Sequence, residues 1–391
     1  MNIRPKTIHD FYYFLWGSAS SFALLAENPV VVQMLAPVPI LLFWIYKDES
    51  KLVTIFISRK IGFLIYLSTL IVGISAFLNG FTVNGLIRFL ALIPAFSILL
   101  MTCEDKDYLN GALRAFAASS FVFVLTHLAL TDWSEILNPK YRLELFLNTN
   151  GVAFIACMCA LVHIVLLAQP GKIKSKTMTF LDVTAVFAGI MVLFLTRSRT
   201  ATAAFIGGAA CLPFVIPGFV SKRIGWLLFF ASFVIVLSVS YWPSIFEFLS
   251  NNFSFFDQYR GVETATNRTE IWTYTFHEII LKNLFFGIGP GNYLDAIERG
   301  TGYTNANNGL FVYMAEIGLL GTIPYVLLLI STFIKTFKSK GLMRLFLAFL
   351  VAGFIESLGE TMFFSTGSVA SLIFLLVVAA ENSGRNTTDE S

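Results

Sequence analysis

The hydrophobic positions of this chain are gathered into long runs, which short polar or Gly/Pro-containing breaks separate. An apolar run of about 20 residues is what an α-helix needs to cross a bilayer. The runs predict twelve helices, at residues 11–27, 29–46, 61–79, 84–102, 111–130, 151–168, 178–196, 200–220, 224–241, 307–333, 345–359 and 366–381. The shortest is expected to be tilted, re-entrant or buried in the bundle. We therefore expect an all-α polytopic membrane protein, whose first apolar run is retained because it lacks a signal-peptide cleavage site.

The composition excludes the other broad classes of protein. Of the 391 residues, 56% are hydrophobic and 13% are charged, whereas a soluble domain carries about 25% charged residues. Disordered chains, collagen, coiled coils and secreted disulfide scaffolds do not fit this balance. The four cysteines lie in apolar runs, where small buried thiols are ordinary, so neither a metal site nor a disulfide is expected.

The distribution of lysine and arginine predicts the orientation of the chain. With a cytoplasmic N-terminus, 18 of the 27 basic residues fall on the inner side and nine on the outer side, as the positive-inside rule requires. Both termini are then cytoplasmic, and the chain divides into helices at 1–241, a large periplasmic loop at 242–306, and helices with a cytoplasmic tail at 307–391. Topology does not explain the nine outer cations, which are Arg88, Lys140, Arg142, Arg197, Arg199, Arg260, Arg268, Lys282 and Arg299.

Two of these cations form a pattern that suits an anion. Arg197 and Arg199 share a short connection between predicted helices with Thr196, Ser198 and Thr200. The planar guanidinium fork donates two parallel hydrogen bonds to phosphate oxygens, and the start of the next helix adds free N–H groups. The pattern predicts a phosphate site, with snorkelling of the arginines to the membrane interface as the alternative.

A further helix is predicted inside the large loop. Asn267 and Glu270 have the spacing of a capping box, so an amphipathic helix is expected to begin at Asn267. Arg268 would then occupy the first turn, where the helix dipole disfavours a cation, and a bound phosphate would compensate it. Arg260 and Trp272 of the same loop are candidate substrate-binding residues.

The end of the large loop is rich in glycine and asparagine. The run Gly287-Ile-Gly-Pro-Gly-Asn292 has no preceding strand and no Walker lysine. It therefore predicts a tight turn that folds the loop back, and not a nucleotide site. Asn307 and Asn308, at the start of the next predicted helix, offer amide groups suited to sugar hydroxyls.

Carboxylates inside the predicted helices are a second kind of candidate. Glu316 falls within an apolar run, and an intramembrane carboxylate is a functional candidate by default. Glu356 and Glu360 are four residues apart and lie on one face of a predicted helix.

Five motifs occur in the order seen in the O-antigen ligase and O-antigen polymerase superfamily, which the chain resembles over about residues 145–330. They are Asn148-Thr-Asn150-Gly, Thr196-Arg-Ser-Arg-Thr-Ala201, Arg268-Thr-Glu-Ile-Trp272, Gly287-Ile-Gly-Pro-Gly-Asn292 and Asn307-Asn-Gly-Leu…Glu316-Ile-Gly-Leu-Leu-Gly321. The resemblance implies a twelve-helix, GT-C-like, inverting glycosyltransferase of the bacterial inner membrane that needs no metal or other cofactor. The implied partners are a glycan donor on undecaprenyl diphosphate, a glycan or lipid A–core acceptor, membrane lipids and a chain-length regulator, with no nucleic acid.

The resemblance also assigns roles to the candidate residues. Arg199, Arg197 and Arg268 would stabilise the diphosphate leaving group while an acceptor hydroxyl attacks from the opposite face. Ligases of the family usually carry a histidine where this chain has Asn307, and an amide cannot take a proton as histidine does. This departure favours a polymerase, a divergent ligase or an inactivated variant. Glu316 joins Arg199 and Arg268 as a candidate catalytic residue, but the base stays open among Glu316, Glu356, Glu360 and Glu263.

A transporter or flippase is the main alternative function. Helices broken by proline, at Pro37, Pro39, Pro213 and Pro217, also suit a transporter of polysaccharide or lipid-linked glycan. No inverted repeat is visible, and a large external loop with arginines favours an external active site. A peptidoglycan-type polymerase fits the ordered motifs less well.

Overall fold

The computed structural model describes residues 60–80, 106–134, 143, 149–168, 175–215, 263–303, 308–339, 344–360 and 377. Every regular element within these residues is a helix, which confirms the all-α expectation for this part of the chain. Three of the helices are long and apolar enough to cross a membrane: α8 (Thr149–Ala168), α9 (Lys176–Thr196) and α15 (Gly309–Lys338). The helices expected at 11–27, 29–46, 84–102 and 224–241, and all but one residue of 366–381, lie outside the described residues. The twelve-helix, GT-C-like arrangement thus stays a prediction.

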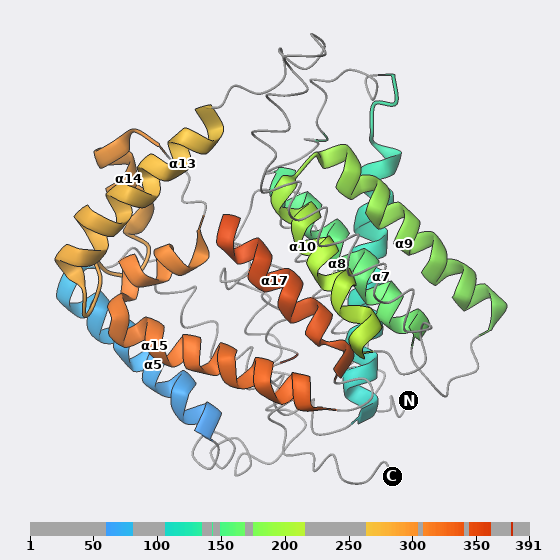
Figure 1. Cartoon of the computed structure of the whole chain (residues 1–391), viewed down its shortest axis with the longest axis horizontal. Coiled ribbons are helices and arrows are strands. Elements are labelled where there is room, and N and C mark those ends of the chain that lie inside the picture. The colour runs from blue at the N-terminus through green and yellow to red at the C-terminus, as the bar shows by residue number, and fades with distance from the viewer. Residues whose placement is uncertain are drawn as a thin grey trace, which may run out of the picture.

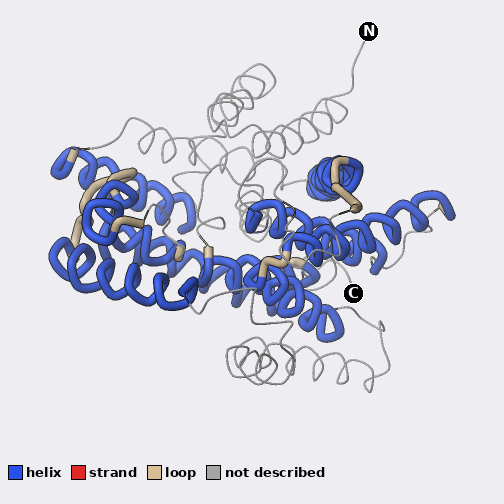
Figure 2. Tube along the Cα trace, turned by 90° about the horizontal axis from the view of Figure 1, so that it is seen from above, coloured by secondary structure: helices blue, strands red, loops and turns tan. Residues whose placement is uncertain are grey.

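The helices form two groups. On one side α7 (Lys106–Ala129), α8, α9, α10 (Arg199–Val215) and α17 (Leu347–Gly359) pack together, and on the other side α5 (Lys60–Asn79) lies along α15 (Figure 1). Figure 2 shows from above that the α9 end and the α13–α14 end lie at opposite sides of the molecule. α15 also contacts α17, so the two groups are packed against each other.

Residues 263–303, which we call the loop segment, are folded into short helices. They comprise α13 (Glu263–Tyr274), a π-helical turn η1 (Thr275–Ile280), a 3-10 turn η2 (Leu281–Asn283) and α14 (Tyr293–Thr301). The segment has a small apolar core of its own, formed by Ile271, Ile279, Ile280, Tyr293 and Ile297 together with Ala315 of α15. This shared core attaches the loop segment to the first half of α15.

The start of α13 corrects one expectation. The helix begins at Glu263, so Asn267 lies inside it and the capping-box prediction is wrong. Glu263 favours the earlier start because a negative charge is stabilised at the positive end of the helix dipole, and Ala265 has high helix propensity. Arg268 consequently lies in the second turn, beyond the first turn in which the dipole acts on it.

The burial of α8 and α9 agrees with their membrane-type composition. α8 is apolar all round and is buried on nearly every side, with Cys157, Met158 and Cys159 fully inaccessible, as expected of a helix in the middle of a bundle. α9 buries one face only. Its opposite face carries Phe180 and Phe187, each 69% exposed, and Phe194, 80% exposed. At a spacing of seven residues these rings follow one stripe of the helix, which suits contact with lipid.

Small residues bring α10 and α17 into close contact. A Cβ atom added to Gly208 of α10 would lie 2.8 Å from the carbonyl oxygen of Ala348, and one added to Gly359 would lie 2.6 Å from the Thr200 methyl carbon. Helices in membranes associate through such close approach because apolar burial offers no gain in lipid. The contact places the end of α17 beside the start of α10.

α15 is interrupted at Gly318, where the loop segment enters the helix. Gly318 has φ 63° and ψ −172°, and the carbonyl groups of Ala315 and Glu316 receive the N–H groups of Ile288 and Gly289, at 2.8 and 3.0 Å. Beyond the interruption, the N–H groups of Leu319 and Leu320 donate to the carbonyl oxygens of Leu284 and Phe285, at 2.8 and 3.2 Å. The loop backbone thus satisfies four groups that the broken helix would leave unpaired.

The glycine-rich run forms the turn that the sequence predicts. Gly287, Gly289 and Gly291 all have positive φ, and the turn returns the chain onto α15. α5 binds both the turn and the adjoining part of α15. Asn79 Nδ2 donates to the Gly287 carbonyl at 2.9 Å, and Ser75 Oγ donates to the Glu316 carbonyl at 3.0 Å. Asn292 Nδ2 adds a bond to the carbonyl of Gly80 at 3.3 Å.

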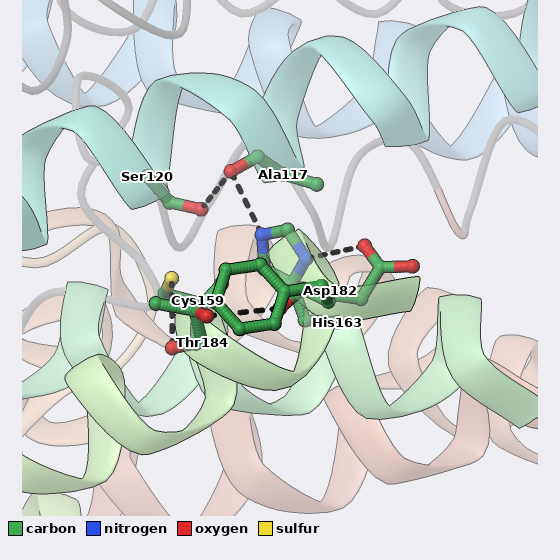
Figure 3. A network of polar contacts seen from close by, with 8 residues as sticks. Ala117, Ser120, Cys159, His163, Asp182 and Thr184 are labelled. Carbon is green, nitrogen blue, oxygen red and sulfur yellow. Dashed lines mark hydrogen bonds and ion pairs between the residues drawn. The ribbon is translucent and has the colours of Figure 1, made fainter. Parts of the chain in front are cut away.

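A buried hydrogen-bonded pair of side chains, which the sequence analysis did not identify, joins α7, α8 and α9 (Figure 3). His163 Nδ1 lies 2.8 Å from Asp182 Oδ1, and His163 Nε2 lies 3.2 Å from the carbonyl oxygen of Ala117. A carbonyl oxygen only accepts, so Nε2 carries a proton and one further proton lies between Nδ1 and Oδ1. Both side chains are about nine-tenths buried or more, and the pair fixes the packing of the three helices.

Replacement of Asp182 by Ala is expected to destabilise the folded protein by about 3–5 kcal/mol, because it leaves a buried imidazole without its partner. Asp182→Asn keeps an acceptor oxygen and is expected to cost less. The double variant His163→Leu/Asp182→Leu removes both polar groups and should recover part of the loss. Thermal unfolding of the detergent-purified chain measures all three, and equal losses in the single and double variants would contradict this role of the pair.

Candidate functional site

Four polar side chains meet where the starts of α8 and α10 and the end of α17 come together beside α13. Arg268 Nη2 lies 3.2 Å from Glu360 Oε1, and Asn150 Nδ2 donates to the same oxygen at 2.6 Å. Ser198 Oγ donates to Asn150 Oδ1 at 2.9 Å. We call Asn150, Ser198, Arg268 and Glu360 the polar network. It joins residues that are as much as 210 positions apart in the chain.

The hairpin between α9 and α10 positions Ser198. α9 ends at Arg197, which has φ 53° and whose N–H donates to the Phe194 carbonyl at 3.1 Å. It is the one non-glycine residue with positive φ among the described residues, a conformation that is uncommon outside glycine. The Ser198 carbonyl accepts from Thr202 Oγ1 at 2.7 Å, so the serine is held by the first turn of α10.

Helix ends position the other members. Asn150 is the second residue of α8, and Glu360 follows the last residue of α17, where its N–H donates to the Glu356 carbonyl at 2.8 Å. Arg268 projects from α13 toward both. The network therefore depends on the close packing of α10 on α17 and on the seating of the loop segment.

Burial is unequal within the central ion pair. The Glu360 side chain is 3% exposed, whereas that of Arg268 is 33% exposed, so Arg268 stands between the carboxylate and the surface. Burial raises the pKa of the Glu360 carboxyl to about 7, against the opposing effects of the Arg268 charge and of hydrogen bonds from Arg268 and Asn150. A carboxyl in this range exchanges protons near neutral pH.

The structure brings several of the predicted site residues to this place. Ser198 and Arg268 belong to the polar network, and Thr200 packs against Gly359 next to Glu360. Asn308 caps α15, where its Oδ1 accepts from the Phe311 N–H at 3.1 Å, and its Nδ2 donates to the Leu358 carbonyl at 3.4 Å. Arg197 and Arg199 flank Ser198 in the hairpin, the first half-buried and the second exposed.

Glu316 and Trp272 are not members of the polar network. Glu316 precedes the interruption of α15 and lies near the core of the loop segment. Burial raises the pKa of the Tyr293 hydroxyl to about 12, a hydrogen bond with Thr275 at 2.9 Å lowers it, and the Glu316 charge raises it. Trp272 packs edge-on against Phe311 with ring centroids 6.1 Å apart. Arg260 and Asn307 lie outside the described residues.

Two members of the polar network, Asn150 and Glu360, are not among the site residues that we selected from the sequence. Asn150 belongs to a recognised motif at the start of α8, and Glu360 is one of four open candidates for a base. Their positions at helix ends were visible in the sequence, but their meeting was not. The part of the chain that the structure describes contains no group of three metal-ligating side chains.

Part of this site lies in a region that matches a known protein family. Residues 184–326 match the family model described as O-antigen ligase, so the predicted resemblance is confirmed. The matched region contains Ser198 and Arg268, whereas Asn150 and Glu360 lie on either side of it. A comparison with curated proteins gives no match to the chain.

Proposed function

We propose that this protein, whose residues 184–326 match the O-antigen ligase domain of the O-antigen ligase and polymerase superfamily, is an integral membrane glycosyltransferase. It transfers a glycan from undecaprenyl diphosphate to a sugar hydroxyl. The observation that carries the proposal is the polar network, since it joins motif residues from three distant parts of the chain around one arginine and one carboxylate.

The arginines bind the donor. When the glycosidic C–O bond breaks, negative charge develops on the diphosphate, and fixed cations that stabilise such charge usually contribute most to catalysis. Arg268 lies in the network, and Arg197 and Arg199 flank Ser198 at the start of α10. Free N–H groups at the start of α10 add to this site. These cations perform the neutralisation, so the reaction proceeds without a metal.

The acceptor side is built from neutral polar and aromatic groups. Asn307 and Asn308 at the start of α15 bind sugar hydroxyls, together with Thr200 and Trp272, and Arg260 contributes from the preceding loop. Trp272 Nε1 is buried and has no hydrogen-bond partner among the described residues, and we assign this N–H to a sugar oxygen. The acceptor is either a growing glycan or lipid A–core.

The proposed setting is the bacterial inner membrane with both termini in the cytoplasm. In that orientation the large loop 242–306 and the polar network face the periplasm, between the helices of 1–241 and those of 307–391. Asn307 stands where ligases of the family usually have histidine, which favours polymerisation over ligation.

A deletion strain examined on surface-glycan gels tests this function. Loss of long chains with one repeat left on the acceptor is the expected result for a polymerase. Loss of all attached chains, with accumulation of lipid-linked polymer, would identify a ligase. An unchanged glycan ladder with blocked movement of another solute would overturn the proposal in favour of a transporter.

A further inference from the structure

We infer that Glu360 is the proton acceptor of the reaction, the group that takes the proton from the attacking sugar hydroxyl. This inference rests on the proposed function, because it requires a lipid-diphosphate donor and a hydroxyl acceptor. It assigns to α17 a role that the matched region 184–326 does not contain. It also supplies a base in a chain that has an amide where relatives usually have histidine.

The position of Glu360 relative to Arg268 meets the geometric requirement. Arg268 uses Nη2 toward Glu360 Oε1, and an arginine has five N–H donors, so its other edge can bind the diphosphate. Two hydrogen bonds of about 3 Å across a guanidinium about 2 Å wide hold the two anions about 7–8 Å apart. Inverting glycosidases separate their two carboxyl groups by about 6.5–9.5 Å, with the attacking water between base and sugar. Here the acceptor hydroxyl occupies the place of that water.

The environment of Glu360 suits proton transfer near neutral pH. Its Oε1 accepts from both Asn150 and Arg268, so both bonds hold the carboxylate through one oxygen, and we assign Oε2 to the acceptor. The charged group that acts on it is Arg268 from α13, and α8 contributes the neutral Asn150; Glu356 is the neighbouring carboxyl on its own helix, and Glu360 acts on it. When a diphosphate shares Arg268, the attraction between Arg268 and Glu360 weakens, and the carboxylate becomes a stronger base.

The other candidate carboxylates are less well placed. Glu356 is fully buried, and its oxygens accept no hydrogen bond from a described residue, whereas Glu360 is bonded directly to Arg268. Glu316 precedes the Gly318 interruption of α15, and its charge acts on Tyr293 in the core of the loop segment. The side chain of Glu263 lies outside the described residues.

The step balances without a further reactant. The acceptor oxygen forms a bond to the anomeric carbon as the bond from that carbon to the diphosphate oxygen breaks. The electron pair of the broken bond passes to the diphosphate, which Arg268 stabilises, and the hydroxyl proton passes to Glu360. The products are the inverted glycoside and undecaprenyl diphosphate, and Glu360 then releases the proton to solvent.

Glu360→Gln tests this role because it keeps the shape and the hydrogen bond from Asn150 but cannot take a proton. In a deletion strain complemented with the variant, we expect transfer to fall about 10²-fold, with Glu360→Asp retaining part of it. Glu298→Gln, an exposed residue of α14, is the matched control and should transfer normally. Transfer by membranes of the wild-type strain should rise as the pH passes through about 7, and this rise should be absent in Glu360→Gln.

Binding of undecaprenyl diphosphate to the purified full chain is a second measurement. It distinguishes a role of Glu360 in proton transfer from a role in holding Arg268 in position. Glu360→Gln should bind this probe at least as tightly as the wild type, because the variant frees Arg268 from its counter-ion. Weak binding, or normal transfer by folded Glu360→Gln, would overturn the inference while leaving the proposed function intact. If the deletion strain makes the same glycan ladder as the wild-type strain, the proposed function itself is overturned.

Discussion

Replacing Arg268 by Ala is expected to reduce glycan transfer about 10²–10³-fold, the loss typical when one preorganised donor to a developing anion is removed. Arg268 is the cation of the polar network, and a third of its side chain is exposed and able to meet a diphosphate. Arg268→Lys is also expected to impair transfer, because lysine lacks the planar fork that binds two anions at once. Arg199→Lys should have the same effect if Arg199 holds the same diphosphate.

The control for this prediction is Arg299→Ala, which removes an exposed cation of α14 whose Nε donates to the Asp295 carbonyl at 3.1 Å. It should leave the glycan ladder unchanged. Arg268→Ala also leaves Glu360 buried without its counter-ion, so the amount and thermal stability of each variant must be measured alongside transfer. Normal ladders from both Arg268→Lys and Arg199→Lys would contradict the diphosphate role.

Gly318→Ala is expected to destabilise the protein by more than about 3 kcal/mol and to remove most of the folded chain from the membrane. The residue has φ 63° and ψ −172°, a region that is almost restricted to glycine. A Cβ atom would lie 2.2 Å from the carbonyl oxygen of Phe285 and 2.3 Å from its carbonyl carbon. These atoms are backbone, so a side-chain movement cannot relieve the clash, and the loop must leave the interrupted helix.

Gly302→Ala separates the two causes of this loss. Gly302 also has positive φ, at 75°, but a Cβ atom there would contact nothing within 4 Å. Its substitution should cost only the conformational term, about 1–2 kcal/mol. Thermal unfolding and the yield of folded chain measure the difference. Equal stability of the two variants would show that the insertion of the loop into α15 carries little of the folding energy.

Hydropathy predicted the described helices well because lipid imposes one requirement on every span. α8 and α9 begin and end close to the apolar runs at 151–168 and 178–196, since a helix must pair its backbone within the bilayer. The loop segment is not a predicted membrane span, so hydropathy does not fix where its helices begin and end. There the weak preference of Asn267 for a cap was outweighed by Glu263 and Ala265 before it, and the start of α13 was misplaced.

The composition of the site was only partly accessible from the sequence. Arg268 and Ser198 were identified because their chemistry suits phosphate, whatever their partners. The pairing of Arg268 with Glu360 spans 92 positions, and that of Asn150 with Glu360 spans 210; no periodicity encodes such contacts. His163 and Asp182 were missed because each is a single polar residue in an apolar run, and only the packing of α8 on α9 makes them a pair.

The insertion of the loop at Gly318 limits how the protein can be divided. The N–H and carbonyl groups of residues 284–289 complete the hydrogen bonding of α15, and Ser75 and Asn79 of α5 bind the carbonyl groups of Glu316 and Gly287 beside them. A chimera that exchanges the loop with that of a relative must therefore carry the first half of α15 and the end of α5 with it.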